Sequence, residues 1–387
     1  MPVKTYRVAI LGCRSRGTAA ARAYHQHPRT EVVALCDLVP ERLEKLGGEL
    51  GVAARYNDMD QMLEEIRPDI AAIPTGTEFH YPLAMRVLER GINIDVEKPM
   101  CTDLEEADAL LARAGERGAR IAVHHQGRTG AALRAILGAI GVGRIGQVRH
   151  LQGSCKGYYA GYGLMNIGTH LLTSMTAVAG PCRSVAATAL VDGRRVGPQD
   201  VLVAPGGMGV VTGERTTAVL EFAGNVSGAL LQHRFPRVDS TGSMIEIYGT
   251  EGRLFWRSGA AWWLPMPHFA PGNPQCQWQP LELALPDGFD PAGPANEADY
   301  GYVDEYVRAL DESREHACSG AAARHVLEIM MGIFEAGAYG RRVELPQKDR
   351  RHPLLRWRAE AGLEPPAPGA RDYGQWLAAE DRRLGRG

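Results

Sequence analysis

Residues 6–17 read YRVAILGCRSRG, an apolar run followed by a turn that two glycines bound. The run predicts a buried strand, and the residues after the turn predict a helix near Thr18–His27. The turn approximates G-x-G-x-x-G, whose first glycine allows a tight turn and whose last lets helix and strand pack closely. A helix that begins there presents unpaired N–H groups to a pyrophosphate. We therefore predict a dinucleotide-phosphate site at Gly12, Arg14, Ser15, Arg16 and Gly17.

A second apolar run, Val32–Cys36, ends directly before Asp37. Asp37 lies about 20 residues after Gly17, the spacing at which an acidic side chain hydrogen-bonds the adenosine ribose in such domains. A carboxylate accepts from a 2′-hydroxyl and repels a 2′-phosphate, so we expect NAD to be favoured over NADP. Arg14 and Arg16 argue the opposite way, because either guanidinium can bind a phosphate. The alternative is a plain strand-to-helix turn with an incidental acid.

Short apolar runs alternate with amphipathic stretches over residues 1–124. Strands that alternate with helices of this length indicate a parallel, doubly wound sheet, an α/β domain of the Rossmann type. We predict strands at Tyr6–Leu11, Val32–Cys36, Ile70–Ile73, Ile92–Val96 and Arg120–Val123, and helices near Thr18–His27, Pro40–Glu49, Met59–Ile66, Pro82–Arg90 and Leu104–Glu116.

The pattern changes at residue 125, where several strands follow one another with few helices between them. This favours an α+β domain with an open, mostly antiparallel sheet over residues 125–346. Residues 265–295 are rich in Pro and Gly and predict a long loop, and residues 347–387 form a charged tail. The predicted strands are Gln147–Ser154, Ser184–Leu190, Thr216–Phe222, Ser227–Arg234, Met244–Tyr248, Arg253–Trp256 and Val343–Pro346, and the predicted helices are Ala131–Ala139, Leu164–Val178, Asp304–Glu312 and Ala322–Ala338.

Composition excludes several classes of protein. The 387 residues are 45% hydrophobic and 23% charged, with a net charge of -2, typical of a globular chain without a basic surface for nucleic acid. No apolar run is long enough to cross a membrane, and the N-terminus leads straight into the first strand without a signal peptide. The 7 cysteines contain no C-x-x-C pair, so we expect reduced thiols, no metal site and a cytoplasmic protein.

Two further motifs carry groups that can move a proton. Glu97-Lys98-Pro99 ends the fifth predicted strand of the first domain, and ligands of doubly wound sheets bind beyond such strand ends. Asn166-Ile167-Gly168-Thr169-His170 places an amide and an imidazole on one face of a predicted helix. The alternatives are an exposed loop ion pair for the first motif and a structural histidine for the second.

Together these segments resemble the Gfo/Idh/MocA family, the glucose-fructose oxidoreductase and inositol dehydrogenase type, over residues 6–346. In that family a Thr-Pro-like segment followed by His comes before the Glu-Lys-Pro motif, and here residues 73–80 read IPTGTEFH. The second domain of the family carries an Asp four residues before a His; here the His is His170, but Asn166 replaces the Asp. The resemblance implies NAD contacts at Thr75, His80, Glu97, Lys98 and Gln126.

The resemblance also implies that Lys98 and His170 flank a substrate hydroxyl or carbonyl next to the nicotinamide. His suits proton transfer near neutral pH, and Lys98 stabilises negative charge on oxygen. Asn166 does not ionise, so it orients the substrate or His170. Further substrate residues are expected at strand ends: Arg128, Lys156, Tyr158, Tyr159 and His233, with Asn166. Each of these strand-end positions can equally be sheet surface or core.

These features predict an NAD-dependent oxidoreductase that acts on a sugar, glycoside or cyclic polyol. One rival is redox-neutral glycoside cleavage, in which NAD oxidises a sugar carbon, a glycosidic bond eliminates and the hydride returns, so that the NAD stays tightly retained. A second rival is a non-catalytic cofactor-binding regulator, which Asn166 keeps open. Apolar strands such as Thr216–Phe222 with few helices to cover them predict a homodimer or homotetramer.

Overall fold

The computed structural model describes residues 4–386 and contains two compact units. Unit 1 comprises the described residues up to Cys101 together with Glu106–Ala131 and Ala284–Ala323. Unit 2 comprises Thr102–Glu105, Ala132–Leu283 and the chain from Arg324 onward. Within this described part, no helix is long and apolar enough to span a bilayer, and no group of three or more potential metal ligands occurs.

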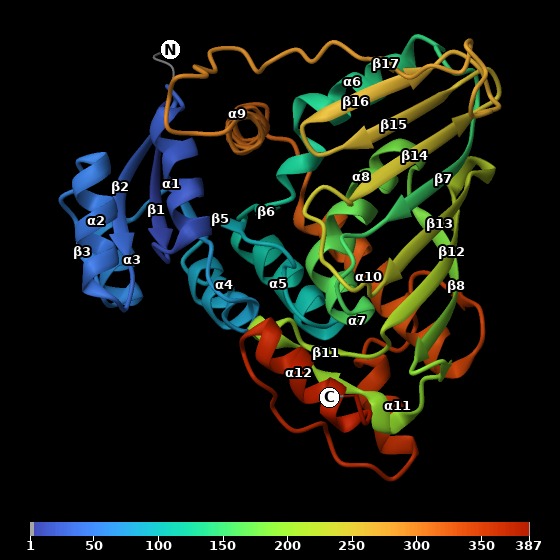
Figure 1. Ribbon diagram of the computed structural model, residues 1–387. Helices are drawn as coiled ribbons and strands as arrows, with labels where there is room; N and C mark the ends of the chain where they lie inside the picture. Colours follow the sequence, from blue (N-terminus) through green and yellow to red (C-terminus); the bar gives the residue numbers. More distant parts are fainter. Residues whose placement is uncertain (1–3, 387) are drawn as a thin grey trace. The chain divides into compact units, whose positions relative to one another are not determined.

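Unit 1 is built on a six-stranded parallel sheet with the order β3-β2-β1-β4-β5-β6, which confirms the predicted doubly wound architecture (Figure 1). The central strands are largely apolar because helices cover both faces, and Ile10, Ala72 and Ile94 are fully or almost fully buried. The strands are β1 (Tyr6–Leu11), β2 (Thr30–Cys36), β3 (Arg55–Tyr56), β4 (Ile70–Ile73), β5 (Asn93–Val96) and β6 (Ile121–Val123).

The helices of unit 1 begin where the sequence offers a suitable first residue. Pro40 occupies the first turn of α2, Asp58 accepts from the N–H groups of Asp60 and Gln61 to cap α3, and Asn296 caps α9. The helices are α1 (Ser15–Gln26), α2 (Pro40–Leu50), α3 (Met59–Ile66), α4 (His80–Leu88), α5 (Leu104–Arg117) and α9 (Glu297–Asp311), with short 3₁₀ turns η1 (Thr77–Phe79) and η2 (Gln126–Arg128).

Unit 2 contains a ten-stranded sheet that is mostly antiparallel, as predicted, with β7 and β13 as a parallel pair. Its path is β17-β16-β15-β14-β7-β13-β12-β8-β18, and β9 pairs with β8. The strands are β7 (Val148–Ser154), β8 (Cys182–Val191), β9 (Arg194–Arg195), β12 (Arg215–Phe222), β13 (Ser227–His233), β14 (Met244–Gly249), β15 (Arg253–Arg257), β16 (Ala260–Leu264), β17 (Gln279–Pro280) and β18 (Val343–Glu344); β10 (Leu202–Val203) and β11 (Val210–Val211) form a separate pair.

Helices cover one face of this sheet (Figure 1). A Cβ on Gly153 of β7 would contact Met175 of α8, and a Cβ on Gly332 of α10 would crowd Val185 of β8, so these glycines bring the helices close. The helical segments are α6 (Ala131–Gly141), α7 (Ala160–Gly163), the π-helical turn η3 (Leu164–Gly168), α8 (Thr169–Ala179), α10 (Gly320–Tyr339), α11 (Pro353–Glu360) and α12 (Tyr373–Arg383), with 3₁₀ turns η4 (Pro198–Asp200), η5 (Pro205–Gly207) and η6 (Ala223–Asn225).

Two segments lie elsewhere than the predicted boundaries of 1–124, 125–346 and 347–387. Residues 284–323 pack into unit 1, where Tyr306 of α9 donates to the carbonyl of Ile94 in β5. The charged tail is part of unit 2 and forms α11 and α12, because Trp376 is buried and its indole N–H donates to the carbonyl of Val203. Both packing arrangements depend on contacts between residues far apart in the sequence.

Candidate functional site

The glycine-bounded turn joins β1 to α1 in the backbone conformation that its glycines require. Gly12 has a φ of +106°, in the region that favours glycine, and a Cβ there would lie 3.3 Å from Thr75 Cγ2. A Cβ on Gly17 would overlap the carbonyl oxygen of Gly12. The two glycines therefore have the local roles that the sequence predicted for them: a tight turn and a close helix–strand approach.

Arg14 stands where the dinucleotide fingerprint has its second glycine. Its backbone is extended, with φ −80° and ψ −175°, so a side chain causes no strain there. Arg14 is exposed, and within residues 4–386 no side chain caps the N-terminus of α1. Unpaired N–H groups at an exposed helix N-terminus fit a pyrophosphate, and the guanidinium of Arg14 adds a positive charge beside them.

Asp37, at the end of β2, is tied to the same turn. One carboxylate oxygen accepts from the N–H of Cys13 at 2.7 Å, and the other accepts from the N–H of Val39 at 2.9 Å. Arg42 lies 3.5 Å away. These contacts fix the carboxylate next to the phosphate-binding turn and leave lone pairs that can accept from ribose hydroxyls. The residues of this edge therefore fit an NAD molecule.

The side chain of Arg16 is engaged inside unit 1, which differs from the prediction that it binds a cofactor phosphate. Its Nε donates to Glu97 at 3.2 Å and its NH2 group donates to Asp299 of α9 at 3.0 Å. The two carboxylates neutralise the guanidinium, so Arg16 offers little charge to a phosphate. Glu97, predicted to contact NAD, is likewise occupied in holding Arg16.

His124 extends this network to a second buried carboxylate. Its Nδ1 lies 3.2 Å from Asp95 and its Nε2 lies 3.0 Å from Asp299, and all three side chains are almost completely buried. Burial alone lowers the pKa of His124, but the charge of Asp95 and hydrogen bonds to both carboxylates outweigh burial and raise it to about 10. Tyr24 and Tyr302 also donate to Asp95. His124 is therefore a structural cation at neutral pH.

The other predicted residues of unit 1 lie at the carboxyl ends of β4, β5 and β6. His80 is completely buried, with Nδ1 2.8 Å from the carbonyl oxygen of Pro99 and Nε2 3.2 Å from that of Thr75. Its ring therefore connects the segments that carry Thr75 and Lys98, and burial lowers its pKa. This corrects the prediction that His80 contacts the cofactor directly, because a fully buried ring with both nitrogens engaged offers no such contact.

The segment after β6 carries Gln126 and Arg128 on the 3₁₀ turn η2, and both are half-buried. The neighbouring His125 is buried, and its pKa falls to about 3 through burial and through the positive charges of Lys98 and Arg128. His125 therefore stays neutral while His124 is charged. The same edge of the parallel sheet thus brings together Gly12, Arg14, Ser15, Gly17, Asp37, Thr75, Lys98, Gln126 and Arg128.

In unit 2, Asn166 and His170 lie on consecutive helical segments rather than on one regular helix. Asn166 is in the π-helical turn η3, and His170 is in the first turn of α8; both side chains are half-buried. Single π turns inside helices are frequent at functional sites. Asn166 Nδ2 donates to the hydroxyl of Tyr162, 3.0 Å away. Tyr162 was not among the predicted residues, although its position four residues before Asn166 is the signal that indicates a shared face.

Lys156 and Tyr158 follow β7 and are half-buried, as a substrate residue requires. Tyr159 is completely buried, its hydroxyl lies 3.3 Å from Glu380, and its ring packs edge-on against Trp376. The prediction that Tyr159 stacks on a sugar is therefore wrong, because no face of its ring is accessible. The two consecutive side chains point in different directions, so Tyr158 stays half-buried while Tyr159 lies in the core.

His233 also lies away from the helical face that carries Asn166 and His170. It pairs across the sheet with Arg215 and hydrogen-bonds Thr217, both of which are exposed on the open face. Its neighbour Gln232 is the residue that faces the helices, since a Cβ on Gly163 or Gly168 would contact the Gln232 amide. The prediction of His233 as a substrate residue is corrected by this alternation of side chains along β13.

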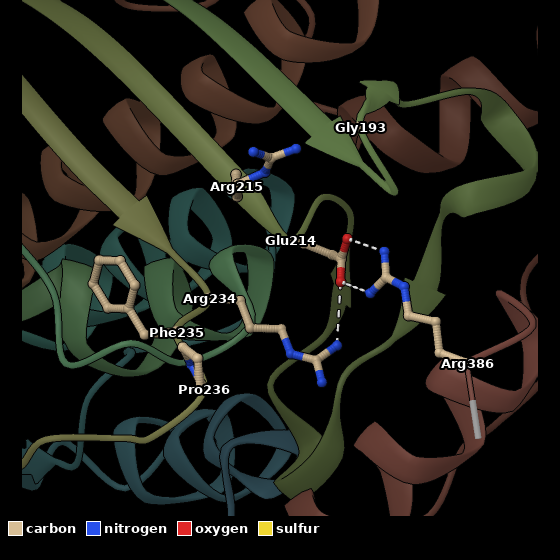
Figure 2. Close-up of a pocket in the computed structure, with 7 residues that line it drawn as sticks. All are labelled: Gly193, Glu214, Arg215, Arg234, Phe235, Pro236 and Arg386. Carbon is tan, nitrogen blue, oxygen red and sulfur yellow. Dashed lines mark hydrogen bonds and ion pairs between the residues drawn. The ribbon is translucent and has the colours of Figure 1, made fainter.

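A pocket of about 330 Å³ lies in unit 2 where β12 begins and β13 ends (Figure 2). Glu214 lies at its centre and pairs with Arg386 and, at 3.2 Å, with Arg234. Burial would raise the pKa of Glu214, but these arginines and the N–H of Asp192 lower it to about 2. The pocket is lined by Gly193, Glu214, Arg215, Arg234, Phe235, Pro236 and Arg386.

Comparison with known proteins gives a family for the N-terminal part of the chain. Residues 6–125 match the GFO_IDH_MocA family, described as an oxidoreductase family with an NAD-binding Rossmann fold. D-apiose dehydrogenase of Paraburkholderia graminis is 30% identical over 144 residues, which are 37% of this chain and 38% of that protein. Glycosyl hydrolase family 109 protein 1 of Bacteroides fragilis is 32% identical over 114 residues, 27% of this chain and 25% of that protein. The chain therefore spans well under half the length of the curated relatives it matches.

Solved structures extend the similarity of fold to most of the chain. The WlbA dehydrogenase of Bordetella pertussis, solved with NADH and UDP-GlcNAcA, superposes with a TM-score of 0.67 at 21% identity. The alignment covers 89% of this chain and 100% of that one. At this identity the similarity establishes the two-part fold and leaves the substrate to be argued from the site.

Proposed function

We propose that this chain, whose residues 6–125 match the Gfo/Idh/MocA family of oxidoreductases with an NAD-binding Rossmann fold, is an NAD-dependent carbohydrate dehydrogenase. In the proposed reaction a hydride moves between the nicotinamide and the hydroxyl-bearing carbon of a sugar, glycoside or cyclic polyol. The observation that carries the proposal is the sheet edge at which Asp37 is hydrogen-bonded to the glycine-bounded turn, with Lys98 at the same edge after β5, which β4 separates from β1.

The proton is handled by residues of the chain. NAD, when bound, accepts the hydride from the substrate carbon. We assign to the Lys98 ammonium the stabilisation of negative charge that develops on the substrate oxygen. His170 takes the hydroxyl proton, because an imidazole accepts and releases protons near neutral pH. Asn166 donates and accepts without titrating, so it orients the substrate or the ring of His170.

Steady-state kinetics with NAD and a panel of sugars, methyl glycosides and polyols tests this assignment. Lys98→Ala and His170→Ala should each lower kcat by roughly 10²–10⁴ while NAD binding is largely kept. Lys348→Ala and His25→Ala are matched controls, because both residues are exposed, Lys348 in the tail and His25 in the last turn of α1. Near-normal turnover of either test variant removes that residue from the mechanism.

A second candidate function is redox-neutral glycoside cleavage, in which the hydride returns to the same sugar after elimination. The similarity to a glycosyl hydrolase family 109 protein and the presence of Asn166 in place of an acid favour it. A pocket of this kind keeps its NAD between turnovers. Release of p-nitrophenol from p-nitrophenyl glycosides without accumulation of NADH supports cleavage, whereas stoichiometric NADH supports the dehydrogenase.

Asn166→Asp separates the two functions further. In a dehydrogenase that releases NADH, the new carboxylate should keep or raise turnover and shift the pH profile. In a pocket that requires a neutral group, a carboxylate beside His170 should raise the pKa of the imidazole and cost about tenfold in turnover near neutral pH. An unimpaired Asp variant that releases NADH at each turnover contradicts the retained-cofactor function.

Asp37 supports a preference for NAD over NADP. A charge-assisted hydrogen bond to the ribose, together with repulsion of a 2′-phosphate, should favour NAD by about 2–4 kcal/mol. Titration of the unmodified protein with both cofactors measures the difference. Tighter binding of NADP would reject the assignment and move attention to the exposed cation Arg14.

We also propose a homodimer or homotetramer that uses the open face of the unit 2 sheet. Alternation along β12 leaves Arg215, Thr217, Val219 and Glu221 exposed on this face, and Val219 is 54% exposed. A sheet face without covering helices gains stability when a partner copy buries its exposed apolar residues, of which Val219 is one. Light scattering that gives 42.0 kDa at micromolar concentration contradicts this assembly.

The cytoplasm is the proposed location. All seven cysteines are free and buried, which suits a reducing compartment. Fractionation of cells that express the full chain tests the location, and recovery in a secreted fraction would contradict it.

A further inference from the structure

Three tyrosine rings from distant parts of the chain form one cluster in unit 2. Tyr162 stacks on Tyr373 with ring centroids 4.9 Å apart and an interplanar angle of 30°. Tyr158 meets both rings edge-on, at 5.4 Å from Tyr162 and 5.1 Å from Tyr373. All three rings are half-buried. The cluster joins the segment after β7 and the helix α7 to the C-terminal helix α12.

The hydroxyl of Tyr162 connects this cluster to Asn166. Its oxygen accepts from the Asn166 amide at 3.0 Å, so its own hydrogen is left to donate. Burial and the neighbouring tyrosines raise the pKa of Tyr162 to about 12, which keeps that hydrogen in place at neutral pH. Among the residues that the structure describes, no acceptor is hydrogen-bonded to it.

Several contacts hold Tyr373 in position against Tyr162. Its hydroxyl accepts from the backbone N–H of Tyr159 at 2.9 Å, and Trp376 one turn later donates to the carbonyl of Val203. At the other end of α12, Asp381 forms two bonds of 2.6 and 2.8 Å with Arg234. Beyond the helix, Arg386 pairs with Glu214, as Figure 2 shows. These ion pairs line the pocket where β12 begins and β13 ends, and they hold the C-terminal segment in place.

We propose that Tyr162 is a further substrate-binding residue, whose hydroxyl donates to an oxygen of the carbohydrate, and that Tyr373 is the positioning residue that holds its ring. This inference rests on the proposed function and deepens it. The ligand class is a polyhydroxylated ring, because hydroxyl oxygens accept from Tyr162 and the C–H face of a pyranose suits aromatic rings. The tail of the chain is thereby part of the substrate site.

Chemical removal of the acceptor oxygen gives a direct test. The full-length protein with NAD is assayed with methyl pyranosides and their monodeoxy analogues, one hydroxyl removed at a time. Tyr162→Phe should raise KM about tenfold, the effect of one uncharged hydrogen bond, while kcat changes by less than about threefold. With the unmodified protein, one deoxy analogue should have a KM about tenfold higher than that of its parent glycoside. With Tyr162→Phe, that analogue and its parent should have equal KM values.

Tyr373 is tested by rescue. Tyr373→Leu removes the stacked ring and should raise KM and reduce the difference in KM between a glycoside and its deoxy analogue. Tyr373→Phe keeps the ring and should restore the KM and that difference to the values of the unmodified protein. Both variants lose the bond from the Tyr159 N–H, so a merely structural role would affect them alike. Tyr339→Phe is the matched control, because Tyr339 is a half-buried tyrosine of α10 that hydrogen-bonds Glu360.

Binding measurements separate this inference from the proposed reaction. Isothermal titration with the same methyl pyranosides reports their affinity whether or not NADH forms. Binding that weakens about tenfold in Tyr162→Phe but not in Tyr339→Phe supports the inference even if no pyranoside is oxidised. Equal KM, equal affinity or unchanged deoxy discrimination in Tyr162→Phe overturns it. Failure of the unmodified protein to bind any pyranoside overturns this inference, whereas the proposed function is decided by oxidation of the sugars, glycosides and polyols in the kinetic panel.

Discussion

In unit 1, Asp299 of α9 holds a helix from late in the chain on the parallel sheet by pairing with His124 and Arg16. In unit 2, Asp381 of α12 and Arg386 hold the last helix on the mixed sheet by pairing with Arg234 and Glu214. Both arrangements attach a distant helix through charged side chains. The carboxylates Asp299 and Glu214 are both buried, at 0% and 7% exposed. The arginines Arg16 and Arg386 are both partly exposed, at 36% and 35%, so the difference lies in His124, a cation that is only 2% exposed.

This difference in burial decides what the ion pairs contribute. A buried charge that loses its partner stays out of water and destabilises the fold strongly. A partly exposed charge that loses its partner regains water, and its attraction is screened by salt. We therefore expect the unit 1 network to be essential for folding of that unit and the unit 2 pairs to act as an adjustable attachment of the C-terminal helix.

The largest effect is expected from Asp299→Asn, which removes negative charge beside the buried His124 and beside the partly exposed Arg16. The free energy of unfolding of unit 1 should fall by about 3–5 kcal/mol. Urea unfolding followed by fluorescence and hydrogen exchange measures it. Asp287→Asn is the control, because Asp287 is 96% exposed and should change stability by less than about 0.5 kcal/mol. Equal effects of the two variants would contradict the comparison.

The next effect in size is a loss of stability at alkaline pH, referred to below as the alkaline limb. The pKa of His124 is raised from 6.5 to about 10, so its contribution is complete below about pH 6.5 and is lost as the pH rises toward 10. The loss should be on the order of 3 kcal/mol. Urea unfolding at several pH values is compared between the unmodified protein and His124→Gln. The variant should lack this limb, and an identical slope above pH 7 in both proteins would refute the assignment.

A smaller effect is expected for Glu214→Gln, which weakens the pairs with Arg386 and Arg234. The attachment of α12 should weaken by about 1–2 kcal/mol, measured as faster hydrogen exchange over residues 373–386. The pKa of Glu214 is lowered from 4.5 to about 2, so the unmodified protein should lose this contribution as the pH falls from about 4.5 toward 2. Exchange of α1 serves as the internal control and should not change.

The smallest effect concerns salt. Raising NaCl from about 0.1 M to 1 M shortens the Debye length from about 10 Å to 3 Å. The difference between Glu214→Gln and the unmodified protein should then shrink by less than about 1 kcal/mol, while that of Asp299→Asn should persist. Equal salt sensitivity of the two differences would show that burial does not distinguish the networks.

Local sequence patterns were sufficient for much of unit 1. Apolar runs such as Val8–Leu11 and Ile70–Ile73 were confirmed as parts of β1 and β4, because the part of a strand that is buried on both faces is apolar; Arg7, near the start of β1, is exposed. The positive φ of Gly12 and the close approach of Gly17 to Gly12 were likewise readable from spacing, since both lie within one short turn. The short strand β3, of two residues, lacked such a pattern.

Period-two alternation was enough to predict strands of unit 2 but not which face the helices cover. It identified the strand that contains Gln232 and His233, yet the packing of α7 and η3 selected Gln232 as the inward residue. It also did not predict the π-helical turn at Asn166. The flanking Gly163 and Gly168 pack against the Gln232 amide, which comes from a strand far along the chain.

The sequence by itself determined the parallel sheet, the phosphate-binding turn and the acid at Asp37, because each depends on residues close together along the chain. Only the tertiary structure decided that Arg16 pairs with Asp299, that Tyr159 is core and that Tyr373 stacks on Tyr162. Those contacts join residues some 200 to 300 positions apart. Nothing in the local pattern of either partner specifies the other, since side chains at such separations meet only when the packing of whole helices and sheets brings them within reach.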